Sequence, residues 1–438
     1  MNVAGGRVED AGSTGEQAGS ATEQKAGERS AGHAQATEHL VQLCSVTPDR
    51  RPGSAGNLAA TEYVAAQLLE LGWEPEMQWF DCLDWESEDS QVRVDGRAWE
   101  VVPSPYSTGA SGSGPLIAAA SKDELAACRA SGAVLVLHGS LTRQPLTPRG
   151  YPFYSSAEDD EVLELIESAE PRAVIAITGR YPELCGAMDP FPFIEDGSSR
   201  VPAAAVGPDV GRHLLAHVGQ LATVDLRASR RPARAANVLA RRGPQDRRVT
   251  VVAHVDSKPG TPGALDNAAG VVALLMVARG LADEPFDGEV GVELLAVNGE
   301  DSYAAPGEVA YLEQARLDEV LLAINFDAVG LPKGPTAWSL YECPSELESL
   351  LRRELVDRPG LVEGPPWFQS DHAIFAMHGR PALAMTSADI TTALASVAHA
   401  PSDTPDRVDI GAVHAAAGAV AAVVRAAIDV DWRTDRLR

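Results

Sequence analysis

The stretch VVAHVDSKPGTPGALDNAAG, residues 251–270, decides the fold. An apolar run ends abruptly at His254, and Asp256 follows two places later. After a turn rich in proline and glycine comes Asp266, and small residues then open a second apolar stretch. The first run predicts a buried strand and the second a helix. A buried strand that ends on His-x-Asp, with another acid after the turn, indicates a functional edge of a sheet.

Strand and helix signals alternate from about residue 234 onward. Strands are predicted at AANVLARR, VTVVAHV, EVGVELLAVN, VLLAINFDAVG and PALAMTS, and helices at NAAGVVALLMVARGLAD, SELESLLRREL and IGAVHAAAGAVAAVVRAAID. Residues 36–71 add helical segments, and EPEMQWFDCLDW reads as a strand. This alternation predicts an α/β fold, a mixed and mostly parallel sheet flanked by helices on both faces.

The section between these parts has a different character. VRVDGRAWEVV has a hairpin signal with Asp95-Gly96 at the turn, and short apolar runs such as GAVLVLHG follow it. We therefore expect a small β-rich α+β domain at 85–233, inserted into a larger, discontinuous domain at 36–84 and 234–438. Residues 1–35 are rich in Gly, Ser, Ala, Glu and Gln and predict a disordered tail.

Composition limits the possible partners and locations. The 438 residues carry a net charge of -26, which argues against sequence-independent binding to nucleic acid or to an anionic membrane. The N-terminal segment has no apolar run, and no stretch of about 20 apolar residues follows, so we expect neither signal peptide nor membrane span. Five scattered cysteines without a CxxC pair fit a reducing compartment. These features together predict a cytoplasmic location.

Chemically active side chains collect where the predicted strands end, the usual place for function in open α/β sheets. These candidates are His254, Asp256, Asp266, Glu300, Asp301, Asp327 and His399. Imidazoles and carboxylates without thiolates suit zinc or another divalent metal in a hydrolytic site. An acid-rich set of five ligands suits two metals that share a carboxylate and a hydroxide nucleophile. A further carboxylate beside the ligands, such as Glu300, suits a general base.

In order and spacing, these motifs resemble the M28 family of zinc metallopeptidases, chiefly aminopeptidases. The similar segments are AHVDS, GALDNAAG, NGED, NFDAVG, SDHAIF and HAPSDTPDRVD. The resemblance implies that Asp266 bridges two zinc ions. It implies that His254 and Asp327 complete one zinc site, and that Asp301 and His399 complete the other.

The resemblance also implies roles for residues beside the ligands. Glu300 would act as general acid/base, and Asp256 would orient the His254 ring. Asp371 would lie near the active site, supporting it rather than binding metal. The family usually has two glutamates where this chain has Glu300-Asp301, and we still expect the shorter Asp301 to coordinate. The inserted section resembles the protease-associated (PA) domain found in this family.

The reaction implied by the resemblance is hydrolysis of the N-terminal amide bond of a peptide or an aminoacylated small molecule. Other amide hydrolysis on the same fold, as in a carboxypeptidase or a deacylase, stays open. A one-zinc reaction of the glutaminyl cyclase kind and a non-catalytic binding protein are further alternatives. The natural substrate, its preferred side chain and the oligomeric state are not determined by the sequence.

Overall fold

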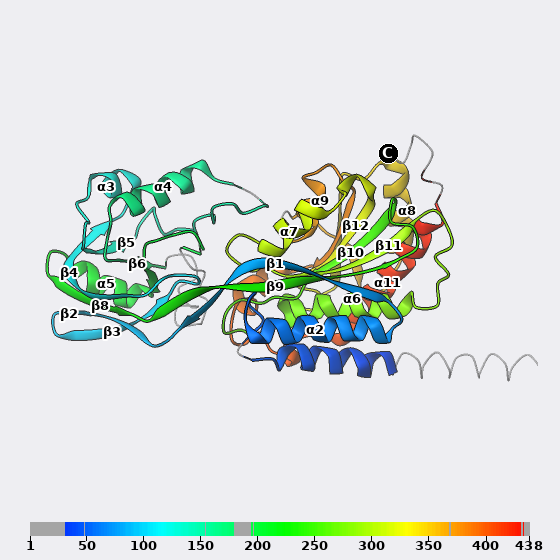
Figure 1. The fold of residues 1–438 in the computed structure, drawn as a ribbon, viewed down its shortest axis with the longest axis horizontal. Helices are drawn as coiled ribbons and strands as arrows, with labels where there is room; N and C mark the ends of the chain where they lie inside the picture. The colour runs from blue at the N-terminus through cyan, green and yellow to red at the C-terminus, as the bar shows by residue number, and fades with distance from the viewer. Residues whose placement is uncertain are drawn as a thin grey trace, which may run out of the picture.

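The molecule is elongated, with two lobes joined by a long ribbon of two strands (Figure 1). The structure, a computed structural model, describes residues 31–47, 49–153, 155–178, 194–195, 197–367, 369–430 and 432. Residues 1–30 of the predicted tail lie outside the described residues, and residues 31–44 are helical. That helix therefore begins before residue 36, where the sequence pattern places the start of the folded domain.

The larger lobe is built on an eight-stranded sheet. In spatial order its strands are β1 (Glu74–Ser87), β9 (Ala228–Arg242), β11 (Gly291–Val297), β10 (Arg248–His254), β12 (Val320–Phe326), β15 (Ala382–Ser387), β13 (Thr336–Tyr341) and β14 (Leu361–Glu363). The central pairs, β11–β10, β10–β12 and β12–β15, are parallel. Antiparallel pairs flank them on both sides, so the predicted mixed sheet with a parallel centre is confirmed.

Helices cover both faces of this sheet, as the sequence pattern predicts. One face carries α2 (Ala55–Glu70), α6 (Ala269–Gly280), α8 (Ser345–Leu355) and α11 (Ile410–Ile428), and the other carries α7 (Pro306–Gln314) and α9 (His372–Ala376). Side chains of β10 point alternately to the two faces of the sheet, so this strand contributes to a core on each face. Val249, Val251 and Ala253 pack on the first side, whereas Val252 packs on the second.

Helix α11 is long and apolar enough to cross a membrane by length and composition. Its packing gives a different explanation, because it lies against α6, α8 and β10. Residues along its length, from Val413 to Ala427, belong to the main core cluster. Its apolar character is therefore that of a core helix.

The smaller lobe is a closed seven-stranded barrel. Its strands are β2 (Ser90–Val94), β3 (Arg97–Pro103), β4 (Ala110–Ala119), β5 (Val134–Leu137), β6 (Ala173–Ile177), β7 (Ala203–Val206) and β8 (Leu221–Leu226), with helices α3 (Lys122–Ala127), α4 (Ala157–Ser168) and α5 (Pro208–Ala216). The predicted hairpin is β2–β3, where Asp95 and Gly96 take the positive φ values of 50° and 72° that its turn requires.

Strands β1 and β9 connect the lobes as one antiparallel ribbon, paired from Glu74–Arg241 to Ser87–Ala228. The predicted boundaries at 84 and 234 fall within this ribbon. Because both crossings of the chain are hydrogen-bonded to each other, the barrel is attached by a paired connection rather than by two separate linkers.

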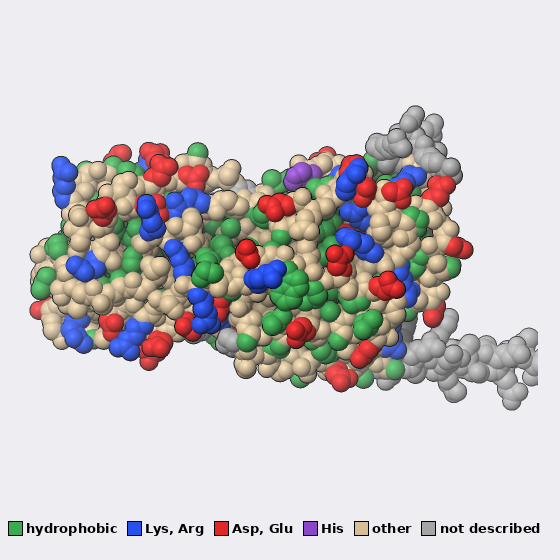
Figure 2. Space-filling model, viewed as in Figure 1, with side chains coloured by type: hydrophobic (Ala, Val, Ile, Leu, Met, Phe, Trp, Pro, Cys, Tyr) green, Lys and Arg blue, Asp and Glu red, His purple; other side chains and the backbone are tan. Residues whose placement is uncertain are grey.

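Charged side chains of both signs are interspersed on the face shown in Figure 2. A group of hydrophobic side chains lies over β1 and α2 on the same face. Exposed large hydrophobic residues of these two elements are Leu58, Leu69 and Trp79. The net negative charge is thus not gathered into one acidic patch on this face.

A buried network of charged side chains links the strands near the starts of β10 and β11, at the end of the sheet opposite the candidate site. Glu293 of β11 is fully buried and accepts hydrogen bonds from Arg241 Nε (2.7 Å), Arg248 Nε (3.4 Å), Thr250 Oγ1 (3.3 Å) and Tyr311 Oη (2.7 Å). Four partners compensate the desolvation of this carboxylate. The network therefore joins β9, β10, β11 and α7.

We predict that Glu293→Ala lowers the free energy of unfolding by about 3–5 kcal/mol, because it leaves the buried guanidinium of Arg248 without this carboxylate. Tyr311→Phe removes one hydroxyl from the same network and should cost only about 1–2 kcal/mol. Urea unfolding of both variants checks this. Equal destabilisation by the two substitutions would contradict the central place of Glu293.

Candidate active site and metal centre

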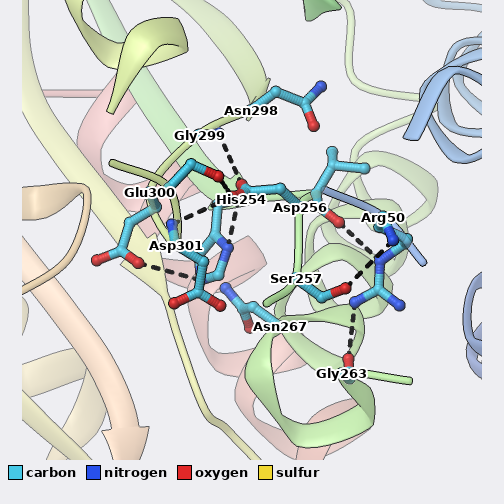
Figure 3. A network of polar contacts seen from close by, with 12 residues as sticks. Arg50, His254, Asp256, Ser257, Gly263, Asn267, Asn298, Gly299, Glu300 and Asp301 are labelled. Atoms are coloured by element: carbon cyan, nitrogen blue, oxygen red, sulfur yellow. Dashed lines mark hydrogen bonds and ion pairs between the residues drawn. The ribbon is translucent and has the colours of Figure 1, made fainter. Parts of the chain in front are cut away.

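The candidate residues meet at the carboxyl ends of the parallel strands, where an α/β sheet places its functional groups. β10 ends at His254, and β12 ends one residue before Asp327. The loop after β11 carries Glu300 and Asp301. Figure 3 shows the side chains of His254, Glu300 and Asp301 close together at this edge of the sheet.

His254 is surrounded by carboxylates. Its Nε2 lies 3.4 Å from Asp266 Oδ1, 3.6 Å from Asp327 Oδ1 and 3.9 Å from Glu300 Oε2. These distances exceed those of good hydrogen bonds. Both ring nitrogens are buried and lack a hydrogen-bond partner among the described residues. The ring therefore faces several acceptors without being satisfied by any one of them.

Asp266 stands between the two histidines. Its Oδ1 faces His254, and its Oδ2 lies 3.1 Å from His399 Nε2. His399 Nε2 is also 2.9 Å from Asp301 Oδ1. The shorter side chain of Asp301 thus still reaches the histidine with which it was expected to share a metal.

The residues fit a divalent cation on two grounds. Ligand atoms of His254, Asp266 and Asp301 all lie within 4.8 Å of one another, and all three residues are buried. The orphaned nitrogens of His254 and the unpartnered Oδ2 of Asp301, the latter judged among the described residues, would gain a partner from a metal. Imidazole and carboxylate are the donors that catalytic zinc sites use.

The electrostatics without metal show why a cation is favoured. Burial opposes charge on His254, yet the carboxylates of Asp256, Asp266 and Asp327 outweigh it and raise the pKa of that ring well above its usual value. Burial raises the pKa of Glu300 well above the ordinary range, and the carboxylates of Asp301 and Asp327 add to this. The cluster therefore holds more negative charge than its two imidazoles can balance.

Asp256 organises the Gly299–Asp301 loop. Its Oδ1 accepts the Gly299 N–H at 2.7 Å, and its Oδ2 accepts the Asp301 N–H at 3.1 Å. The same Oδ1 lies 3.5 Å from His254 Nδ1. Asp256 thus lies beside the His254 ring and also fixes the loop that carries the acid pair (Figure 3). Its role in orienting the ring stays a prediction.

The amide after Asp266 ties that residue to the end of β12. Asn267 Nδ2 donates to the Phe326 carbonyl at 2.8 Å, and Asn267 Oδ1 accepts the Gly270 N–H at 3.0 Å. A Cβ on Gly270 would lie 2.2 Å from Asn267 Oδ1 and 2.6 Å from Phe326 O. The Asp-Asn-x-x-Gly motif therefore lets α6 approach β12 closely enough to place Asp266 beside Asp327.

Arg50 fixes the loop between His254 and Asp266, and no sequence pattern predicts this role. Its guanidinium is buried and donates to the carbonyls of Val255, Pro262 and Gly263. Its backbone N–H donates to Ser257 Oγ. One arginine thus fixes both ends of the segment between His254 and Asp266 (Figure 3). No sequence signal indicates it, because arginine is rarely buried.

Two further buried acids lie behind the acid pair. Burial, with Asp256 nearby, raises the pKa of Glu308 to about 8. Burial also raises the pKa of Asp371 well above its usual value, and Glu308 is its strongest charged neighbour. Neither is among the described residues that line the cavity. Asp371 therefore lies near His254 and Asp327 but is not among the described lining residues, and its supporting role stays a prediction.

A cavity of about 460 Å³ opens over the centre, within the usual range for ligand pockets. Asp266, Glu300, Asp301, Asp327 and His399 line its floor, and Tyr151, Tyr303, Trp367, Ile390 and Leu394 add aromatic and aliphatic surface. Trp338 and Tyr341 of strand β13 are buried core residues. His372 is also fully buried and faces the Trp367 carbonyl.

Comparison with known proteins identifies this part of the chain. Residues 237–424 match peptidase family M28. This segment belongs to peptidase family M28. The M28 segment spans β10, β11, β12 and β15, and it contains all seven candidate residues.

Curated relatives of the chain carry aminopeptidase names. A Mycobacterium tuberculosis protein, "Probable lipoprotein aminopeptidase LpqL", is 26% identical over 297 residues, which are 65% of this chain and 55% of that protein. Aminopeptidase YwaD of Bacillus subtilis is 36% identical over 95 residues, 20% of this chain and 19% of YwaD. The matches thus span about half of the first relative and a fifth of the second.

Two solved structures share the fold over nearly the whole chain. The zinc aminopeptidase BSAP of Bacillus subtilis superposes with a TM-score of 0.69 at 19% identity, covering 92% of this chain and 97% of BSAP. An aminopeptidase from Aneurinibacillus sp. strain AM-1 gives 0.67 at 19% identity, covering 90% and 93%. The likeness therefore extends over the barrel as well as the sheet. That the barrel is a PA domain stays a prediction.

We predict that Gly270→Ala destabilises the fold by about 1–3 kcal/mol and lowers the amount of bound metal, because its Cβ would displace Asn267 or β12. Gly418→Ala is the matched control, since nothing lies within 4 Å of its Cβ in α11. The control should be neutral or gain up to about 1 kcal/mol. Thermal unfolding and metal analysis measure both variants, and normal metal content in Gly270→Ala would refute the motif's proposed role.

Proposed function

We propose that this protein is a dinuclear-zinc aminopeptidase that hydrolyses the N-terminal amide bond of a peptide or an aminoacylated small molecule. The observation that carries the proposal is the position of Asp266, whose two oxygens face two different histidines. Each histidine has its own second carboxylate, Asp327 for His254 and Asp301 for His399. One shared carboxylate with two such pairs is the donor set of a two-metal hydrolytic site.

The ligand assignment follows from these pairs. His254 and Asp327 would hold one zinc ion, His399 and Asp301 the other, and Asp266 both. Zinc, when bound, supplies Lewis-acid polarisation of the scissile carbonyl and makes water acidic enough to serve as a nucleophile near neutral pH. The names of the similar proteins, two of which are aminopeptidases and one a zinc aminopeptidase, support this choice of metal and reaction.

Glu300 is the residue best placed to move the proton. It lines the cavity beside the ligands, and burial raises the pKa of its carboxyl. As the attacking water adds to the carbonyl carbon, a Glu300 oxygen takes its proton. When the carbon–nitrogen bond breaks, the same oxygen returns that proton to the departing nitrogen. Asp256 holds this loop through Gly299 and Asp301, so the carboxyl stays aimed at the reacting atoms.

The acid-lined floor favours a substrate with a positive charge next to the scissile bond, as in a free N-terminal amine. A carboxypeptidase or a deacylase would use the same centre with a different substrate orientation. The cytoplasmic location and the absence of nucleic-acid and membrane partners stay predictions from the sequence.

Hydrolysis of a peptide panel, in free and N-acetylated forms, with zinc added, tests the reaction class. Mass spectrometry should show loss of one N-terminal residue from the free peptides only. Removal of C-terminal residues, or cleavage of the acetylated peptides, would assign another amide hydrolase. No cleavage of any peptide would overturn the peptidase proposal.

We predict that Glu300→Gln lowers kcat by about 100-fold or more while zinc content and fold are retained, because the amide cannot accept the proton. Asp318→Asn on the exposed surface is a matched acid-to-amide control and should leave kcat unchanged. Steady-state kinetics with metal analysis measures both. Near-normal kcat in Glu300→Gln would remove Glu300 from the proton-transfer role.

A further inference from the structure

A lysine lies in the loop that joins the two ligand-bearing segments. Lys258 follows Asp256 by two residues, and its Nζ lies 2.7 Å from Glu195 Oε2 of the barrel lobe. Their side chains are 11% and 10% exposed, so both charges are largely removed from water. Lys258 and Glu195 both line the cavity over the metal centre.

Lys258 is a positive charge in a cavity whose other charged side chains are mostly acidic. Among the described residues that line the cavity, Lys258 is the single lysine or arginine. The lining acids are Asp159, Glu195, Asp266, Glu300, Asp301 and Asp327. An anionic group of a substrate would be repelled over most of this surface. Lys258 is the only lysine or arginine on the described wall with which such a group can form an ion pair.

The cavity is also limited in extent. The barrel lobe closes one side of it with Gln144–Pro148 and Tyr151. At about 460 Å³ it has the size of a small-molecule pocket rather than that of a long peptide groove. A peptide that begins at the metal centre must end, or leave the cavity, within a few residues, since each residue spans about 3.3–3.6 Å.

We propose that Lys258 binds the C-terminal carboxylate of a very short peptide, so that dipeptides are the preferred substrates. This inference rests on the proposed aminopeptidase function. An ammonium has three N–H donors in different directions and serves two carboxylates at once. Lys258 therefore binds the substrate carboxylate while it remains paired with Glu195. The amine end lies at the acidic floor and the carboxylate end at the lysine, which orients the substrate.

The competing explanation is that the Lys258–Glu195 pair only ties the barrel to the sheet domain. The two explanations differ in how they treat a substrate without a carboxylate. A purely structural tie affects every substrate alike. A carboxylate site affects only the substrate that carries the negative charge.

The experiment compares leucyl-leucine with leucyl-leucine amide in the zinc-loaded full chain, for wild type, Lys258→Gln, Lys258→Arg and Glu195→Gln. Wild type should prefer the free acid. In Lys258→Gln the ratio of kcat/KM for acid over amide should fall by about tenfold or more, mainly through KM. Lys258→Arg keeps the charge and should keep most of the preference. Circular dichroism and zinc content verify that each variant is folded and loaded.

Glu195→Gln separates the two explanations, because it breaks the ion pair but keeps the ammonium. Its acid-over-amide ratio should equal or exceed that of wild type. An unchanged ratio in Lys258→Gln, with both rates reduced equally, would overturn the carboxylate site and leave a structural tie. So would a wild type that does not distinguish acid from amide. Failure of wild type to cleave either dipeptide, in a preparation that cleaves longer peptides, refutes this inference alone; failure on all peptides refutes the proposed function as well.

Discussion

The structure depends on one constraint, the burial of several carboxylates around two histidines. Asp266 has one oxygen toward His254 and the other toward His399. Burial favours the neutral carboxyl, but the two imidazoles have the larger effect and lower the pKa of Asp266. Burial raises the pKa of Asp327 instead. Such a cluster is costly without positive charge, because like charges in a low dielectric repel strongly. Bound cations would relieve that cost, so we expect metal binding to stabilise the fold.

Much of the surrounding structure serves to hold these groups in place against their repulsion. Asp256 fixes the loop of the acid pair, Asn267 fixes the segment of Asp266 to β12, and Arg50 fixes the loop between them. These contacts join the loop before α2 to the segments around β10, β11, β12 and α6. The barrel lobe adds the outer wall of the cavity and the Glu195 partner of Lys258.

Local sequence signals predicted most of the sheet domain, because strands such as β10 are continuous apolar runs that end at polar residues. His254 and Asp327 were expected at strand ends because each is the polar residue at which such an apolar run stops. The family resemblance, rather than spacing alone, predicted which residues pair with which. β13 and the short helix Ile390–Ser396 were missed, since TAWSLY reads as scattered aromatics and the helix has little apolar periodicity. Arg50 and the Lys258–Glu195 pair depend on contacts between distant segments, which no local pattern reports.

The central claim is that Asp266 is shared by two zinc ions. Anomalous diffraction from a crystal of the zinc-loaded protein, measured on both sides of the zinc absorption edge, tests it most directly. The account predicts two zinc peaks per chain, one beside His254 and Asp327 and one beside His399 and Asp301, with an Asp266 oxygen bound to each. A single peak, or two peaks that do not both contact Asp266, would contradict it.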